Sequence, residues 1–178
     1  MNKKYEIFAN ELLKWNKTHK FTNYTTKEEI FAQIEDSLFP LEYIKNAKTA
    51  ADVGTGAGFP GLVLAIALPQ TKWYLIEPLK KRYSFLNYIK ILLDLNNVEI
   101  IPKRVEKSDI GKADLITSRA VMKTDDFLNL VNPFLDKNGT ILLYKGSNAL
   151  EELGGINAKI INKKNRNYVF IKAKQWEK

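Results

Sequence analysis

The glycine-rich segment at residues 52–61 constrains the fold of this chain more than any other part. It reads Asp-Val-Gly-Thr-Gly-Ala-Gly-Phe-Pro-Gly, and it overlaps the end of a short apolar stretch at 49–53 and the start of an apolar run at 60–68. Glycines at alternate positions let the backbone turn tightly, and they let a ligand lie against it without an intervening Cβ atom. A strand, a glycine turn and a helix in this order predict the ligand-binding end of an α/β sheet.

Strands and helices alternate through the rest of the chain. The hydrophobic pattern predicts strands at 49–53, 72–77, 98–101, 114–117 and 140–144. It predicts helices between them at 60–68, 79–95 and 125–135. Two final short strands, 158–161 and 168–174, flank a polar run and predict an antiparallel hairpin. We therefore expect a mostly parallel sheet, with a ligand at the carboxyl ends of its strands.

Two helices are predicted before the sheet. Apolar residues recur at helical spacing over residues 3–17, at Tyr5, Phe8, Leu12 and Trp15. Thr26 is a favoured N-cap residue and Glu29 follows three positions later, which is the spacing of a capping box. The second helix should run from there to Pro40. We expect residues 1–48 to form a short helical cap on the sheet of residues 49–178.

Length and composition favour one globular domain, residues 1–178. The chain is 45% apolar and 27% charged, which is typical of a globular protein, and 178 residues are enough for one core. Its longest apolar run, 62–68, is far shorter than the roughly 20 residues of a membrane span. The first residues lack the apolar region of a signal peptide. We expect a cytoplasmic protein without a membrane partner, and a monomer, because no segment indicates an oligomer interface.

The chain contains no cysteine. This excludes disulfides, thiolate metal sites, iron–sulfur clusters and mechanisms with a cysteine nucleophile. It contains one histidine, His19, in a polar N-terminal stretch, and no pattern that indicates a catalytic dyad. We expect no metal site.

The net charge of +8 lies entirely in residues 72–178, because residues 1–71 are neutral. A basic half beside a neutral half favours a surface that faces a polyanion, whereas the alternative is a lysine-rich face that only aids solubility. The chain uses lysine for most of its positive charge. Its few arginines are therefore candidates for planar, forked contacts that lysine cannot make: Arg82, Arg104, Arg119 and Arg166.

Two acids at strand ends indicate an adenosine cofactor. Asp52 ends the first strand, where it can accept hydrogen bonds from an amine or brace the loop, and Glu77 ends the second, where it can accept from both hydroxyls of a ribose. The glycines at 56, 58 and 61 also match the dinucleotide fingerprint, so NAD is an alternative. S-adenosylmethionine fits better. An acid beside the loop suits the amino group of methionine, and too little chain remains for a substrate domain.

The sequence resembles the RsmG (GidB) family of bacterial small-subunit ribosomal RNA guanine-N7 methyltransferases. The resemblance covers most of the chain and is carried by Trp15-Asn16-Lys17, Asp36-Ser37, the loop 52–61, Glu77, Lys81-Arg82, Phe85-Leu86, Arg104-Val105-Glu106, Ser118-Arg119-Ala120, Lys145-Gly146 and 169–173. It implies a Rossmann-like class I methyltransferase fold, with a short N-terminal helical extension and a C-terminal antiparallel hairpin. It also implies transfer of a methyl group from S-adenosylmethionine to N7 of a guanosine in the 16S rRNA of the small ribosomal subunit.

The residue types are compatible with this chemistry. Guanine N7 carries an in-plane lone pair, so direct displacement needs no base, and the rate can come from alignment of the two reactants. Methylation at cytosine C5 would need a cysteine. Methylation of an exocyclic amine usually relies on an Asn/Asp-Pro-Pro-aromatic motif after the fourth strand, where this chain has Thr-Ser-Arg-Ala at 117–120. Two alternatives remain, a methyltransferase that acts on a small molecule and an RNA-binding module without catalysis.

These arguments give two sets of candidate site residues. The candidate cofactor contacts, of which Val105, Glu106, Gly54 and Phe59 are carried over from the resemblance, are Asp52, Gly54, Gly56, Gly58, Phe59, Glu77, Val105, Glu106 and Arg119. The candidate catalytic or RNA-binding residues are Arg119, Arg104, Lys145 and Arg166. Two positions depart from the family pattern: Gln33 stands where the family usually has histidine, and Lys20 where it usually has asparagine.

Overall fold

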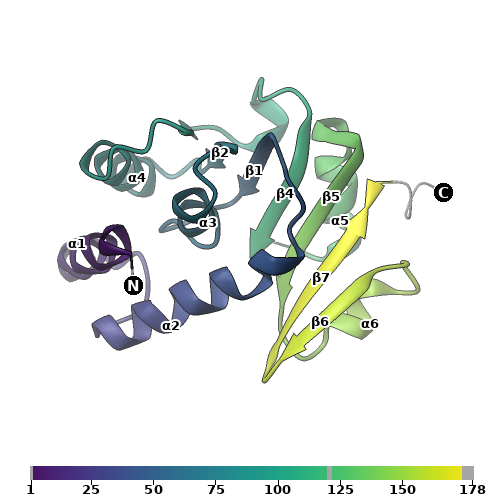
Figure 1. Ribbon diagram of the computed structural model, residues 1–178, viewed down its shortest axis with the longest axis horizontal. Coiled ribbons are helices and arrows are strands. Elements are labelled where there is room, and N and C mark those ends of the chain that lie inside the picture. Colours follow the sequence, from purple (N-terminus) through teal and green to yellow (C-terminus); the bar gives the residue numbers. More distant parts are fainter. Residues whose placement is uncertain (1, 120–121, 174–178) are drawn as a thin grey trace.

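The computed structural model describes residues 2–119 and 122–173 (Figure 1). Its strands are β1 (Thr49–Val53), β2 (Lys72–Ile76), β3 (Val98–Ile101), β4 (Ala113–Arg119), β5 (Leu135–Lys145), β6 (Lys159–Lys163) and β7 (Arg166–Lys172). Its α-helices are α1 (Lys3–His19), α2 (Lys27–Leu38), α3 (Gly61–Ala67), α4 (Lys80–Leu92), α5 (Thr124–Val131) and α6 (Ala149–Leu153). Short 3₁₀ turns follow α2, β3 and α5, at Phe39–Tyr43, Val105–Lys107 and Asn132–Phe134.

All the strands form one sheet, in the order β3-β2-β1-β4-β5-β7-β6. Strands β1 to β5 are parallel, whereas β7 runs antiparallel to both β5 and β6. The predicted fold class is therefore confirmed, including the C-terminal hairpin. Because β1 to β5 are parallel, their carboxyl ends meet at one edge of the sheet, where the loop after β1 lies close to the end of β4.

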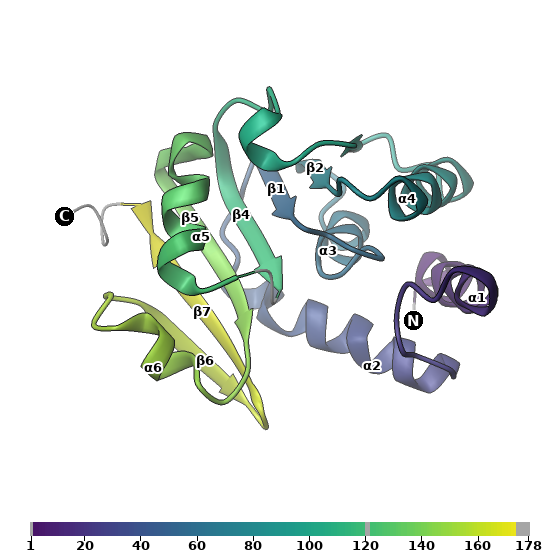
Figure 2. The same cartoon turned by 180° about the vertical axis from the view of Figure 1, so that it is seen from behind.

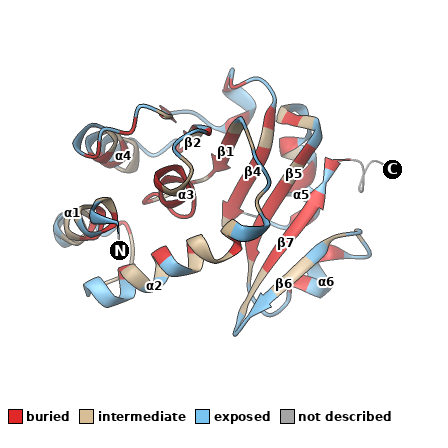
Figure 3. Ribbon diagram, in the orientation of Figure 1, coloured by how far each residue is buried: buried red, intermediate tan, exposed pale blue. Residues whose placement is uncertain are grey.

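Helices cover both faces of the sheet. On one face, α3 and α4 pack in the same core as α1 and α2, around residues such as Phe8, Leu64 and Phe85. On the other face, α5 and α6 pack on β4, β5 and β7 around Phe127 and Leu153 (Figure 2). The central strands are buried by both layers (Figure 3). Among the described residues, no helix has the length and apolar character that a membrane span requires.

Several element bounds differ from the prediction. The helix expected at 125–135 ends at Val131, because Pro133 cannot continue it, and β5 already begins at Leu135. Helix α6 was not predicted, since its five residues are too short for a helical pattern to emerge. The predicted strand 168–174 ends at Lys172, and Lys174 lies outside the described residues. The capping box of α2 is confirmed, because Thr26 and Glu29 each accept the other's backbone N–H.

A buried aspartate ties three elements together beneath the glycine loop. Asp52, at the end of β1, has no exposed surface. One carboxylate oxygen accepts the backbone N–H of Gly61 at 2.9 Å, and the other accepts the hydroxyl of Thr117 on β4 at 2.6 Å. Burial raises the pKa of Asp52, and the hydrogen bonds it accepts act in the opposite direction. Asp52 therefore links β1, β4 and the first residue of α3.

The approach of α3 to β1 leaves no room for a side chain at Gly61. A Cβ atom there would lie 2.4 Å from the Cβ of Asp52 and 2.6 Å from a methyl group of Leu75. Neither neighbour can move freely, because both are fully buried. Position 61 therefore requires glycine on steric grounds, without any demand from a ligand.

We predict that Gly61→Ala lowers the free energy of unfolding by roughly 1–3 kcal/mol, the usual cost of overpacking a core. Gly146→Ala is the matched control, because nothing lies within 4 Å of a Cβ added there and its φ is not positive. The control should change stability by less than about 0.5 kcal/mol. Urea unfolding of both variants measures the difference, and equal stability would contradict the close packing.

The raised pKa of Asp52 predicts a specific pH dependence of stability. As the pH rises above the unfolded value of about 4, the unfolded chain ionises while the folded protein resists ionisation, so Asp52 makes folding less favourable. Asp52→Asn cannot ionise and can still accept from Gly61. Its stability relative to the original chain should therefore increase from pH 4 to pH 7 in urea unfolding. A pH-independent difference between the two would contradict this.

Asp52→Ala tests the hydrogen bonds instead of the charge. It leaves the N–H of Gly61 and the hydroxyl of Thr117 buried without a partner. Each such group costs roughly 1–3 kcal/mol, so Asp52→Ala should be clearly less stable than Asp52→Asn at every pH. Equal stability of the two variants at pH 7 would show that the bonds contribute little.

Candidate active site

A cleft of about 430 Å³ opens at the carboxyl ends of β1 and β2. The loop after β1 forms one wall, the segment after β2 forms another, and the end of β4 and the loop after α1 complete it. Its lining residues are Phe21, Thr22, Gly54, Thr55, Gly56, Ala57, Phe59, Glu77, Pro78, Leu79, Arg82 and Arg119. The structure thus brings together five of the predicted site residues: Gly54, Gly56, Phe59, Glu77 and Arg119.

Glu77 is the acid of this cleft. It is only 3% exposed, and its carboxylate accepts the backbone N–H of Gly56 at 3.0 Å and that of Leu79 at 2.9 Å. The guanidinium of Arg82 lies 3.8 Å away. An ionised carboxylate has about four acceptor positions, so capacity remains after these two bonds. Glu77 is held in a fixed orientation and can still accept hydroxyl groups from a ligand.

The backbone of the glycine loop leaves few donors for a ligand. Gly54 and Thr55 donate to Ile76, and Gly58 and Phe59 donate to Thr55. The N–H of Gly56 donates to Glu77. A pyrophosphate bound at such a turn needs several free N–H groups, and most of those in this loop already have an acceptor within the protein. The structure therefore supports a ligand without phosphates and disfavours the dinucleotide alternative.

Arg119, the last residue of β4, separates the cleft from helix α2. Its Nη1 atom donates to Oε1 of Gln33 at 2.9 Å and lies 3.7 Å from Oδ2 of Asp36. The guanidinium also lies over the ring of Phe59, 5.1 Å from its centroid. The side chain is 16% exposed. Arg119 therefore presents a positive charge to the cleft while α2 and the glycine loop fix its position.

Some predicted residues do not line this cleft. Asp52 lies beneath it, fully buried in the bracing position described above. Gly58 faces the core, because a Cβ atom added there would lie 3.0 Å from the Cβ atom of Leu62. Val105 is buried in the core of the opposite face, and its neighbours Arg104 and Glu106 are exposed. Their predicted roles as ligand contacts remain predictions.

Two of the candidate catalytic or RNA-binding residues, Lys145 and Arg166, pair with acids outside this cleft. Lys145 forms an ion pair of 2.6 Å with Glu152 of α6. Arg166, at the start of β7, donates to Asp36 at 3.0 Å. Asp36 therefore lies between Arg166 and Arg119, which the sequence places far apart. Neither Lys145 nor Arg166 lines the cleft. Arg166 is connected to it through Asp36, which lies 3.7 Å from the cleft residue Arg119.

The sequence did not indicate Phe21 and Thr22, and it left Arg82 open between a forked contact and a solvated helix face. Phe21 and Thr22 lie in the loop after α1, which Asn16 fixes by donating to Thr22 at 2.6 Å and to the backbone of Tyr24 at 3.1 Å. No periodic pattern marks such a loop. The rarity of arginine in this chain was the available signal for Arg82, which the structure places beside Glu77.

Among the described residues that line the cleft, Glu77 is the one acid and none is a histidine. His19 lies outside it and stacks on Phe21, with 5.5 Å between ring centroids. In the part of the chain that the structure describes, no group of three acids or histidines could hold a metal ion. The cleft thus offers one carboxylate, two guanidinium groups and aromatic surface, which can bind and orient reactants.

Comparison with known proteins agrees with this arrangement. The family model described as "GidB: rRNA small subunit methyltransferase G" matches residues 1–177. A ribosomal RNA small subunit methyltransferase G of Aliarcobacter butzleri is 46% identical over 170 residues, covering 94% of this chain and 88% of the relative. The protein of the same name from Helicobacter pylori strain 26695 is 40% identical over 98% of both chains.

Solved structures support the fold. A SAM-dependent methyltransferase from Aquifex aeolicus superposes with a TM-score of 0.65 at 18% identity, over 79% of this chain and 90% of that one. TYW2 of M. jannaschii, solved in complex with AdoMet, gives 0.58 at 21% identity, over 79% and 74%. These likenesses concern the fold alone. The sequence matches over nearly the whole chain go further, and they show that this protein belongs to the GidB family of rRNA small subunit methyltransferases G.

Proposed function

We propose that this chain transfers the methyl group of S-adenosylmethionine to N7 of a guanosine in 16S rRNA of the small ribosomal subunit. Membership of the GidB family carries the proposal, and relatives at 40–46% identity bear the name of a small-subunit rRNA methyltransferase. In this proposal the chain acts as a monomer in the cytoplasm, which is where ribosomal subunits are assembled. Its net charge of +8 supports a polyanionic substrate.

The cleft fits S-adenosylmethionine better than a phosphate-bearing cofactor. Glu77 can still accept hydrogen bonds from ribose hydroxyls. A ligand without phosphates does not need the loop N–H groups, most of which already donate within the protein. Gly54 and Gly56 adopt positive φ angles of 74° and 61°, so the loop keeps a shape that side chains would strain. When bound, this cofactor supplies a methyl carbon activated by a sulfonium. Gly54, Gly56, Phe59 and Glu77 would hold it.

The protein contributes position and electrostatics to the reaction. Guanine N7 already has a lone pair, so no residue has to remove a proton before attack. Arg119 is at the end of β4 beside the loop, and its forked guanidinium can bind guanine O6 or a phosphate. Gln33 and Asp36 keep this arginine oriented. Holding both reactants in alignment then supplies the rate.

Neither of the alternative functions has an observation in its favour. RNA binding without catalysis does not require a carboxylate such as Glu77, which two backbone N–H groups orient in a cleft. The excess of positive charge in residues 72–178 favours a polyanionic substrate over a small molecule. Both alternatives also disagree with the family.

Methyl transfer can be measured directly. The protein is incubated with labelled S-adenosylmethionine and with small subunits from a strain that lacks this activity, and separately with free 16S rRNA. We expect label at N7 of a guanosine, detected by the selective chain cleavage that N7-methylguanosine allows. Absence of label in both substrates would reject the proposed function, and label at another atom would reject the N7 assignment.

Two variants separate the cofactor side of the cleft from the substrate side. Glu77→Gln should weaken S-adenosylmethionine binding by roughly ten- to a hundredfold, since a hydrogen bond to a charged group contributes about 1.5–3 kcal/mol. Arg119→Ala should abolish transfer while leaving cofactor affinity nearly unchanged. Calorimetry gives the affinity and the labelling assay gives the transfer rate. Loss of cofactor affinity in Arg119→Ala would move this arginine to the cofactor side.

A further inference from the structure

A second cleft, also of about 430 Å³, lies between helix α2 and the turn that joins β6 to β7. It is distinct from the first cleft, because no residue lines both. The turn and the end of α2 meet near the carboxyl ends of β4 and β5 (Figure 1). The residues that matter to its chemistry are Gln33, Asp36, Lys163, Lys164, Arg166 and Tyr168.

Asp36 is the centre of this second cleft. One of its oxygens accepts Nε of Arg166 at 3.0 Å and the hydroxyl of Tyr168 at 2.9 Å. Its other oxygen lies 3.7 Å from Arg119 and accepts no hydrogen bond. One carboxylate is thus shared between two guanidinium groups, which leaves an excess of positive charge around it.

Arg166 lines the second cleft. Its Nε is bound to Asp36, whereas its two terminal nitrogens have no protein partner among the described residues. The side chain is 30% exposed. A guanidinium held by one nitrogen and free at the other two can donate two parallel hydrogen bonds to a phosphate.

Two lysines flank Arg166 in the turn. The ammonium of Lys163 lies over the ring of Phe39, 4.3 Å from its centroid, and Lys164 has a left-handed backbone with φ 54°. Both side chains are exposed, and neither forms an ion pair with a described acid. Among the described residues that line this cleft, Glu35 is the only other acid. The mouth of the cleft is therefore positive, which favours an anion.

Arg119 connects the two clefts. It lines the first cleft, and it binds Gln33 and Asp36, which line the second. A ligand that extends past Arg119 would occupy both. An RNA strand can occupy both clefts, because a phosphate is linked to each side of every internal nucleoside along the strand.

We propose that the second cleft binds a backbone phosphate of the RNA strand next to the target nucleotide, through Arg166 with Lys163 and Lys164. This inference rests on the proposed function, because it places the same substrate along a second site. The first cleft then holds the reacting base, and the second fixes the strand that carries it. Arg119 and Asp36 set the spacing between the two.

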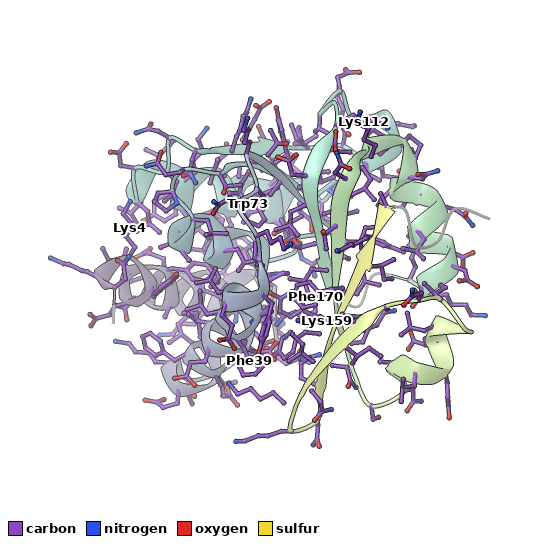
Figure 4. The ribbon with its side chains drawn as sticks, turned by 45° about the vertical axis from the view of Figure 1, so that its right-hand side comes forward. Lys4, Phe39, Trp73, Lys112, Lys159 and Phe170 are labelled. Carbon is purple, nitrogen blue, oxygen red and sulfur yellow. The ribbon has the colours of Figure 1, made fainter. Side chains whose placement is uncertain are left out.

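The test replaces the charges of the turn with Lys163→Gln and Lys164→Gln in one protein. The matched control is Lys112→Gln with Lys137→Gln, which removes two charges near the amino ends of β4 and β5. Lys112 lies at the opposite end of the sheet from the β6–β7 turn (Figure 4). All four lysines are exposed, and the control pair forms no ion pair with a described residue.

The probe is a fluorescent single-stranded RNA oligonucleotide, titrated at several salt concentrations. We expect the turn variant to bind roughly tenfold more weakly at low salt, with a slope of log affinity against log salt that is shallower by about 0.7 per lost phosphate contact. The control variant should bind like the original protein. S-adenosylmethionine affinity, measured by calorimetry, should be the same in all three proteins. Urea unfolding should show that all three are folded, with the turn variant slightly less stable because Lys163→Gln removes the contact with the ring of Phe39.

Equal losses in the turn variant and the control would overturn the inference, because they would indicate a diffuse electrostatic effect. So would a turn variant that loses affinity for inorganic phosphate but binds the RNA normally. If the original protein methylates small subunits and the turn variant does so at the same KM and rate, the inference alone fails. If the original protein transfers no methyl group, the proposed function and this inference fail together.

Discussion

The buried carboxylate of Asp52 is the interaction on which the rest of the site depends. It joins the end of β1 to Thr117 of β4 and to the first N–H of α3, and it does so with no contact with solvent. A buried carboxyl group is costly unless its oxygens are hydrogen-bonded, and here both are. The same contact forces the helix so close to the strand that only glycine fits at position 61. The shape of the glycine loop follows from this constraint.

The loop in turn sets the chemistry of the cleft. Most of its N–H groups donate to the loop itself, to Ile76 or to Glu77, so few remain to bind an anion. What remains for a ligand is the carboxylate of Glu77, with Arg82 3.8 Å from it, and the positive charge of Arg119 at the end of β4. The carboxylate can accept from ribose hydroxyls, and Arg119 can donate to an electron-rich or anionic group.

Much of this was predictable from local sequence. The strand, the glycine turn and the helix, the capping box at Thr26 and the hairpin all depend on residues close together in the chain, and all are confirmed. Errors occurred where a short-range signal was weak or a proline intervened. Helix α5 ended before Pro133, and the five residues of α6 gave no period to detect.

The sequence by itself determined the fold class, the family and the position of the loop and its acids, because each rests on residue types at fixed local spacing. Only the tertiary structure decided which side chains surround Arg119. Asp36 meets Arg166 across 130 positions of sequence, and Gln33 meets Arg119 across 86. No periodicity records such a distance, since these contacts arise from how α2 and the β6–β7 hairpin pack at the same edge of the sheet.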